Sequence, residues 1–244
     1  MQDEGGPGGA IIRQVIGLDS PYLSAAVDLF KEIFPDEQHY VPYLRACTLL
    51  RSPDHPATLD HVWVVERDGH LVGVRIFSYV LDRDVGHGAY VGMLAPHRGQ
   101  GLGSWLVRRT LAQLCADAEA LGRPKPLGYC VEVDPVGGAA DEAERRERKR
   151  VLHFHLTRGG LLLDVDYVEP PMIQGVGYIT AEELAGVEPR PMHLIFYPTP
   201  PRAALDQAEL IQVVEALYLD VYRLTPDSWY MCRAMDSIRR WGKA

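Results

Sequence analysis

Hydrophobic residues recur along the chain at two spacings, one typical of strands and one typical of helices. Short apolar or alternating runs predict strands, whereas apolar residues every three or four positions predict helices. The clearest strand pair lies at 61–80, where two apolar runs flank Asp68-Gly69, a dipeptide typical of a tight hairpin turn. The same pattern predicts further strands at 10–16, 90–94, 127–133, 161–168 and 192–197, and helices at 21–34, 40–50, 102–121, 141–158, 205–224 and from 225 onward.

The stretch at 89–120 joins a predicted strand to a long helix through a loop that carries Gly99, Gly101 and Gly103. The helix begins at Leu102. Its free backbone N–H groups and its dipole favour an anion at this end, and glycine lets a phosphate approach the backbone closely. The sequence therefore predicts an anion site at the start of this helix. The apolar face expected to be buried comprises Val107, Leu111, Leu114, Cys115, Ala118 and Leu121.

The spacing of the glycines excludes two common phosphate-binding motifs. A Walker loop needs a Lys-Ser or Lys-Thr after the glycines, and the dinucleotide fingerprint is G-x-G-x-x-G; neither is present here. The pattern that fits is R-x-x-G-x-G, formed by Arg98, Gly101 and Gly103. This loop, between a strand and a long amphipathic helix, resembles the pyrophosphate-binding motif of the GNAT N-acetyltransferase superfamily, which holds acetyl-CoA.

The resemblance implies a fold and a domain organisation. It implies an α/β (α+β) domain of the GNAT type at 10–197, with a mixed, mostly antiparallel central sheet flanked by helices. The order of the predicted elements agrees with that superfamily. We expect residues 1–9 to form a flexible N-terminus. Residues 198–244 lie outside the resemblance, and we expect a helical extension that packs on the domain or at a homodimer interface.

The resemblance also implies which residues hold acetyl-CoA as co-substrate. The strand end would pair with the pantetheine arm, and the loop would bind the pyrophosphate through its backbone. One residue, His97, separates Pro96 from Arg98, whereas the superfamily has two, so this loop is one residue shorter. The expected coenzyme-binding residues are Met93, Leu94, Ala95, Arg98, Gly99, Gln100, Gly101, Gly103 and Ser104.

Glu132 is the expected general base. It lies inside the apolar run at 127–133, where a carboxylate is unusual, and burial raises the pKa of a carboxyl toward working pH. In related folds this strand end lies at the acceptor site, beside a splay between the two central strands. Asp134 follows on the same face, although a carboxylate at a strand end also caps turns.

His155 is the expected general acid for the thiolate leaving group. The superfamily pattern F-Y-x-x-x-G-F carries a tyrosine on the penultimate helix, and here the run Phe154 to Gly160 has His155 at that position. Histidine donates a proton at neutral pH more readily than tyrosine does. A buried structural histidine is the competing interpretation.

Composition limits the class of protein and its partners. The net charge of −8 argues against a nucleic-acid partner, and no apolar run is long enough to span a membrane. The four cysteines form no C-x-x-C pair, so we expect reduced thiols, no metal site and a cytoplasmic location. Acidic residues at 164–169 would suit a cationic acceptor.

Three functions remain open at this level. The first is acetyl transfer from acetyl-CoA to an amine of a small molecule or peptide. The second is a catalytically impaired GNAT-fold module that binds or senses acyl-CoA, which the missing tyrosine favours. The third, ATP binding through the glycines, lacks the expected lysine.

Overall fold

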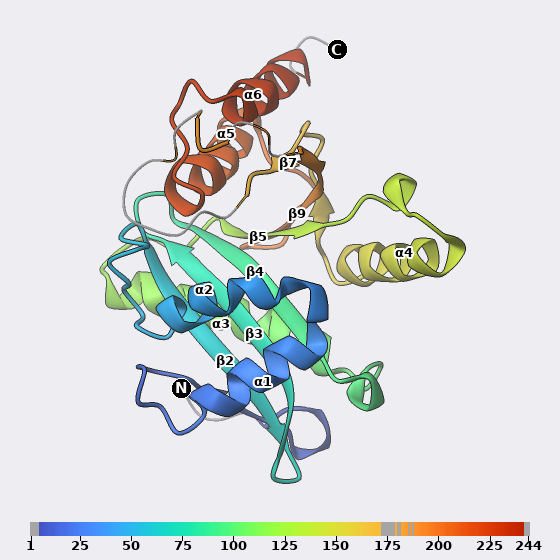
Figure 1. Cartoon of the computed structure of the whole chain (residues 1–244). Coiled ribbons are helices and arrows are strands. Elements are labelled where there is room, and N and C mark those ends of the chain that lie inside the picture. Colours follow the sequence, from blue (N-terminus) through green and yellow to red (C-terminus); the bar gives the residue numbers. More distant parts are fainter. Residues whose placement is uncertain (1–4, 172–178, 180–181, 185, 187, 242–244) are drawn as a thin grey trace.

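The computed structural model describes residues 5–171, 179, 182–184, 186 and 188–241. Helices cover both faces of a seven-stranded sheet with the order β1-β2-β3-β4-β5-β9-β6 (Figure 1). Neighbouring strands are antiparallel except β4 and β5, which confirms the predicted mixed, mostly antiparallel GNAT-type sheet. The elements are η1 Pro7–Gly9, β1 Ile11–Gln14, α1 Leu23–Ile33, η2 Pro35–Tyr40, α2 Val41–Cys47, β2 Thr58–Arg67, β3 His70–Val80, β4 Val85–Met93, η3 Ala95–His97, α3 Leu102–Ala120, β5 Gly128–Val133, η4 Val136–Gly138, α4 Glu142–Leu156, β6 Leu161–Leu162, β7 Val168–Glu169, β8 Arg190–Pro191, β9 His193–Pro198, α5 Gln207–Glu215, η5 Ala216–Val221 and α6 Trp229–Trp241.

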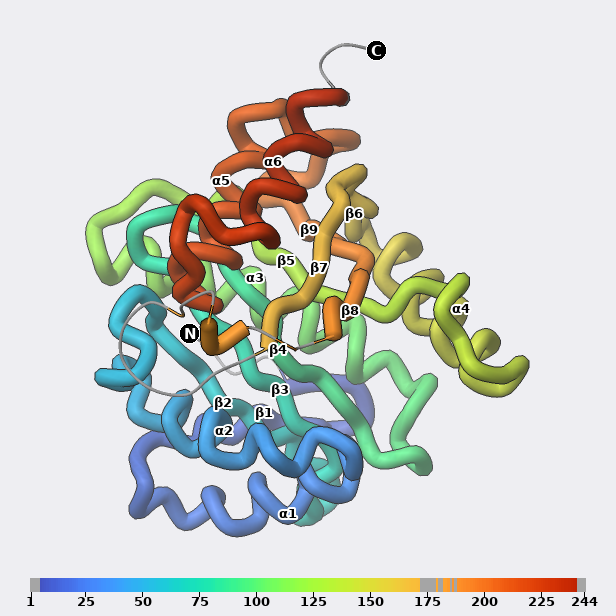
Figure 2. Tube along the Cα trace, turned by 45° about the horizontal axis from the view of Figure 1, so that its top comes forward, coloured from blue at the N-terminus to red at the C-terminus, as the bar shows by residue number. Residues whose placement is uncertain are grey.

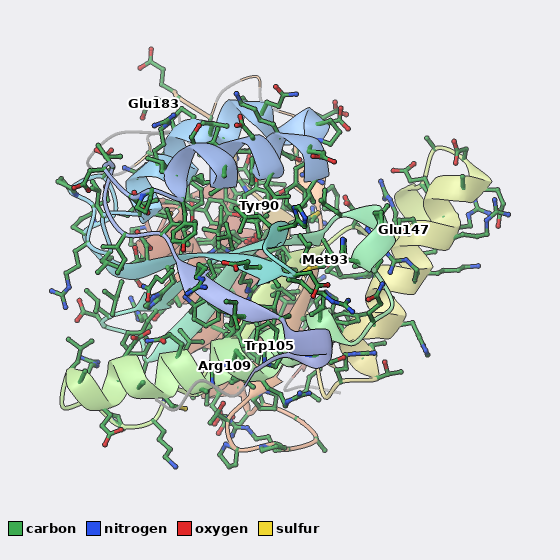
Figure 3. All side chains as sticks on the ribbon, turned by 90° about the horizontal axis from the view of Figure 1, so that it is seen from below. Tyr90, Met93, Trp105, Arg109, Glu147 and Glu183 are labelled. Carbon is green, nitrogen blue, oxygen red and sulfur yellow. The ribbon has the colours of Figure 1, made fainter. Side chains whose placement is uncertain are left out.

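The β2–β3 hairpin forms the centre of the N-terminal half, as its pattern predicts. Asp68 and Gly69 both have positive φ, which the right-handed twist of a two-residue hairpin requires. On one face of the sheet, α1 and α2 bury an apolar cluster that includes Phe30 and Leu44, and on the other face α3 buries a second cluster. Figure 3 shows this layering, with Tyr90 under α1 and α2 and Trp105 on α3 across the sheet.

The buried face of α3 is rotated from the predicted one. Leu102, Trp105, Leu106 and Thr110 are buried, whereas Leu121 is exposed. The apolar residues of this helix extend over more than one face, so periodicity did not select the side that meets the sheet. Leu114 and Ala118 belong to both the predicted and the observed sets, and the predicted Val107, Leu111 and Cys115 are only half-buried.

Two strand predictions need correction. The run 161–168 is not one strand, because residues 163–167 between β6 and β7 are not in a strand and β7 pairs with β8 in a second, two-stranded sheet. The strand before the glycine loop is longer than predicted, since β4 already begins at Val85. Its polar start belongs in the sheet because Gly86 leaves room for Leu114 and Tyr129, which lie 2.4 and 2.6 Å from where a Cβ would stand.

The C-terminal segment packs on the sheet. Residues of α5, η5 and α6, among them Val213, Leu217 and Ile238, share an apolar cluster with β5 and β9 residues such as Phe196. The helix predicted at 205–224 is α5 followed by a π-helical turn, η5. Tyr222, the residue after η5, contacts Glu132 of β5. None of the helices in the described ranges is long and apolar enough to cross a membrane.

Candidate active site

The sheet opens between its two central strands. The parallel strands β4 and β5 pair only over Val85–His87 and Gly128–Cys130, at one end of each strand. Beyond that point β5 continues to pair with β9 on its other side, whereas β4 continues alone beside β3 to Met93. Two cavities adjoin this opening. Phe34, the residue immediately before η2, lines both of them.

The first cavity, here called the coenzyme cavity, has a volume of about 570 Å³ and lies between the end of β4, the start of α3 and α4. In Figure 3, Met93 on β4 and Glu147 on α4 mark two of its walls. Arg98, Arg150 and Arg158 also line it. Three guanidinium groups beside a helix N-terminus favour a ligand with several negative charges.

The geometry of the loop explains why it contains glycine. Gly99 and Gly101 have φ of +74° and +83°, a conformation that other residues adopt only with strain. Gly103 has ordinary φ, but a Cβ there would lie 3.0 Å from the Phe154 ring of α4. The third glycine therefore lets α4 approach the helix start, and Arg158, two residues after α4 ends, donates a hydrogen bond to Ser104 Oγ there.

Most of the residues predicted to bind the coenzyme line the coenzyme cavity. Met93, Arg98, Gly99, Gly101, Gly103 and Ser104 line it, whereas Leu94, Ala95 and Gln100 do not. The Gln100 side chain instead donates to the Pro96 carbonyl at 2.8 Å and pairs with Arg67. Arg98 donates from Nε to the Met93 carbonyl at 3.0 Å, so this side chain ties the loop to the strand end.

His155 lies in the wall of the coenzyme cavity, and it is buried. Its Nδ1 lies 2.7 Å from the Tyr197 hydroxyl. Burial, together with the nearby charges of Arg75 and Arg158, lowers the pKa of His155 to about 4. The imidazole is therefore neutral at pH 7, and the expectation of a histidine that readily donates a proton there as imidazolium does not describe this side chain.

The second cavity, here called the acidic cavity, has a volume of about 230 Å³ and lies on the other side of the opening. It is walled by β4, β5, η2, the β7–β8 pair and the residue that follows η5. Figure 2 shows β7 and β8 crossing in front of β4. Its lining residues are Phe34, Glu37, Tyr40, His87, Ala89, Tyr90, Glu132, Asp134, Glu169, Arg190, Met192 and Tyr222.

Glu132 lies deep in the acidic cavity, with 8% of its side chain exposed. Tyr167 and Tyr222 donate hydroxyl hydrogen bonds to it, and His87 Nε2 lies 3.1 Å from Oε2. Burial raises the pKa of Glu132, but the hydrogen bonds from His87, Tyr167 and Tyr222 outweigh burial, so the pKa is lowered. The rise in pKa expected from its apolar surroundings is therefore absent. Whether Glu132 acts as the base stays a prediction.

Glu169 has the opposite character. Burial and the charge of Glu132, with further contributions from Glu37 and Asp134, raise its pKa to about 8, even though Arg190 Nη1 lies 3.0 Å from its Oε2. A carboxyl with this pKa exchanges a proton near neutral pH. The sequence indicated only that the acidic residues at 164–169 suit a cation; no local pattern distinguished Glu169 from its neighbours.

Sequence reasoning also missed His87, Glu37, Arg190 and Tyr222 as residues of one site. They come from four elements far apart in the chain, and each has an ordinary local context. Asp134, named beside Glu132 in the sequence, lies at the rim and accepts hydrogen bonds from Arg190 at 3.1 and 3.3 Å.

Comparisons with known proteins agree with this architecture. Residues 23–123 match the family model described as the acetyltransferase (GNAT) family. The matched segment runs from α1 beyond the end of α3 and includes the glycine loop, which confirms the predicted resemblance. The chain thus has the GNAT fold, and its match to the acetyltransferase family model covers 23–123. No curated protein sequence matches the chain.

Solved structures resemble the chain at low sequence identity. A protein described as a GNAT-family acetyltransferase from Bacteroides thetaiotaomicron is 22% identical, with a TM-score of 0.55, over 88% of this chain and 99% of its own. A GNAT-family acetyltransferase from Elizabethkingia anophelis with acetyl-CoA bound is 13% identical, with a TM-score of 0.45, over 78% and 97%. An acetyltransferase from Bacillus subtilis in complex with CoA is 13% identical, with a TM-score of 0.43, over 77% and 97%.

Proposed function

We propose that this protein is an acetyl-CoA-dependent N-acetyltransferase that transfers an acetyl group directly to an amine. The observation that carries the proposal is the adjacency of two cavities of opposite charge at the opening between β4 and β5. The coenzyme cavity has three arginines and one glutamate in its walls, and the acidic cavity has four carboxylates and one arginine. An anionic acyl donor and a cationic acceptor would thus meet at Phe34.

The residues of the coenzyme cavity fit acetyl-CoA. The N–H groups at the start of α3, with Arg150 and Arg158, would hold the phosphates, and the end of β4 would hold the pantetheine arm. Acetyl-CoA, when bound, supplies an acetyl group activated as a thioester. In the overall transfer, the C–S bond breaks and a C–N bond forms. The ammonium acceptor loses two protons, one to the sulfur of CoA, which leaves as the free thiol, and one to the solvent.

Glu169 is the residue that we propose as the proton acceptor. A base with a pKa near 8 removes a proton from an ammonium group far better than the low-pKa carboxylate of Glu132 does. Glu132 then has a different role: its charge, held by Tyr167 and Tyr222, attracts the ammonium and orients His87.

His155 would act on the sulfur side as a neutral hydrogen-bond donor. With the Tyr197 hydroxyl donating to Nδ1, the ring proton lies on Nε2, which makes Nε2 the donor toward the coenzyme. This role requires no positive charge on the ring, in agreement with its lowered pKa.

Two measurements test the proposal. Calorimetric titration should show binding of acetyl-CoA and no binding of ATP, and release of CoA thiol in the presence of amines should show transfer. Arg158→Ala should weaken acetyl-CoA binding by about 10-fold, since it loses one charge-assisted contact. Arg146→Ala on the exposed side of α4 is the matched control and should bind normally.

The outcomes separate the possible functions. If acetyl-CoA does not bind, the proposal is wrong. If it binds but no amine gives thiol release, the chain is an acyl-CoA-binding module instead.

A further inference from the structure

The acidic cavity carries more negative charge than one ammonium group compensates. Glu37, Glu132, Asp134 and Glu169 line it, and Arg190 is the one lysine or arginine among its described lining residues. Arg190 already contacts both Glu169 and Asp134, and Arg148 approaches Asp134 at 3.9 Å. Glu37 and Glu132 therefore remain without a lysine or arginine partner in the described contacts.

The carboxylates lie at different depths. Glu132 has 8% of its side chain exposed, whereas Glu169, Glu37 and Asp134 have 24, 26 and 35% exposed. The negative charge thus extends from a deep end to a rim, and a ligand with two separated cationic nitrogens would match both ends at once.

A second, independent observation indicates a ligand at the deep end. His87 is 1% exposed and lines the acidic cavity, yet its Nδ1 has no hydrogen-bond partner in the described part of the chain. Since the Glu132 carboxylate only accepts hydrogen bonds, Nε2 must donate to it, and Nδ1 is an acceptor when the ring carries this one proton. A buried acceptor without a partner is costly, and an amine N–H would satisfy it.

The walls and the size favour a short aliphatic chain. Phe34, Tyr40, Tyr90 and Tyr222 present aromatic rings, which pack on methylene groups and attract ammonium groups. A volume of about 230 Å³ equals about eight water volumes of ~30 Å³ each, so a chain of roughly that many non-hydrogen atoms fits. A ligand carboxylate would face the carboxylates of Glu37, Glu132 and Asp134, which disfavours amino acids.

We propose that the acidic cavity binds a short aliphatic diamine or polyamine, with one cationic nitrogen at Glu132 and His87 and a second at Glu37 and Glu169. The inference rests on the proposed acetyl transfer, because it names the acceptor class, and the product is the amine acetylated on one nitrogen.

The test compares matched acceptors in the thiol-release assay. The three probes are 1,4-diaminobutane, 4-aminobutan-1-ol and 4-aminobutanoate. The amino alcohol has a hydroxyl in place of one ammonium group of the diamine, and 4-aminobutanoate has a carboxylate in place of one aminomethyl group. We expect kcat/KM for the diamine to exceed that for the amino alcohol by on the order of 10- to 100-fold, with the amino acid slowest. Glu37→Gln should bring the ratio of diamine to amino alcohol down toward one, and Glu32→Gln, exposed on α1, should leave that ratio unchanged.

The results distinguish the two levels of the proposal. Equal turnover of the diamine and the amino alcohol, or an unchanged ratio in Glu37→Gln, overturns the diamine assignment while acetyl transfer stands. Binding of acetyl-CoA without thiol release from any of the three probes or from a lysine-containing peptide overturns both. Calorimetric titration of 1,4-diaminobutane into the protein with CoA bound provides a check independent of turnover, and no heat of binding there counts against the diamine.

Discussion

Replacing Glu169 with Gln should stabilise the fold at neutral and alkaline pH, although it removes the proposed proton acceptor. The carboxyl has a pKa of about 8 in the folded chain and 4.5 as its ordinary value. Because the folded-state pKa is raised, the folded chain binds the proton more tightly than the unfolded chain does. The contribution of this group to the free energy of unfolding is therefore intact below pH 4.5 and is lost progressively as the pH rises to about 8.

The magnitude follows from the difference in pKa. The folded and unfolded pKa values of Glu169 differ by about 3.5, and each pKa unit corresponds to 1.36 kcal/mol. Ionisation of Glu169 therefore lowers the free energy of unfolding by on the order of 5 kcal/mol at pH 9, and by about 3 kcal/mol at pH 7. Glutamine keeps the size of the neutral carboxyl but does not ionise, so the variant avoids this loss. The stability gained by the variant over the wild type should thus be near zero at pH 4.5 and grow with pH.

Urea denaturation followed by tryptophan fluorescence at pH 4.5, 7 and 9 measures this gain. Glu119→Gln, at an exposed position of α3, is the control and should follow the wild type at every pH. A gain that stays constant from pH 4.5 to pH 9 would refute the argument, since it would show that Glu169 ionises normally in the folded chain. In the same protein, kcat/KM for amines should fall strongly in Glu169→Gln and lose its rise near pH 8.

Three further substitutions probe the rest of the site. Glu132→Gln should lower kcat/KM for amines by at least 10-fold and leave acetyl-CoA affinity, measured by calorimetry, within about twofold of the wild type. The reason is that the acidic cavity and the coenzyme cavity are lined by different residues apart from Phe34. An equal loss of acetyl-CoA affinity would contradict this separation. NMR titration should give His155 a pKa near 4, and Arg75→Met should raise it, since burial persists while the Arg75 charge is removed; an unshifted resonance in Arg75→Met would show that burial alone sets the value. Gly101→Ala should destabilise the fold by about 1–2 kcal/mol in urea because its φ is +83°, whereas a Cβ there would make only an ordinary contact with Pro7 at 3.5 Å. Wild-type stability would contradict the assigned strain.

Sequence pattern identified the elements whose signals are local. The Asp68-Gly69 turn, the glycine loop and the helix from Leu102 to Ala120 all lie where the pattern predicts them. Each depends on the conformational preference of a few neighbouring residues, such as positive φ at glycine, so no distant contact was needed to predict it.

Position along the chain could not predict the charge state of the site. Glu132 and Glu169 line the same cavity, yet three hydrogen-bond donors lower the pKa of Glu132, and the charge of Glu132 helps raise the pKa of Glu169. His155 was expected to donate a proton at neutral pH, but burial, with the charges of Arg75 and Arg158, lowers its pKa to about 4. Electrostatic interactions depend on distance in space, which periodicity does not encode.

The sequence by itself determined that a strand, a glycine loop and a helix follow one another, since these depend on backbone conformation within about thirty residues. Only the tertiary structure decided that His87, Glu37, Arg190 and Tyr222 join Glu132 and Glu169 around a second cavity. The physical reason is the opening of the sheet between β4 and β5, which lets η2, β7, β8 and the residue after η5 close around one space. That assembly results from packing between elements up to 185 positions apart, from Glu37 to Tyr222 (222 minus 37).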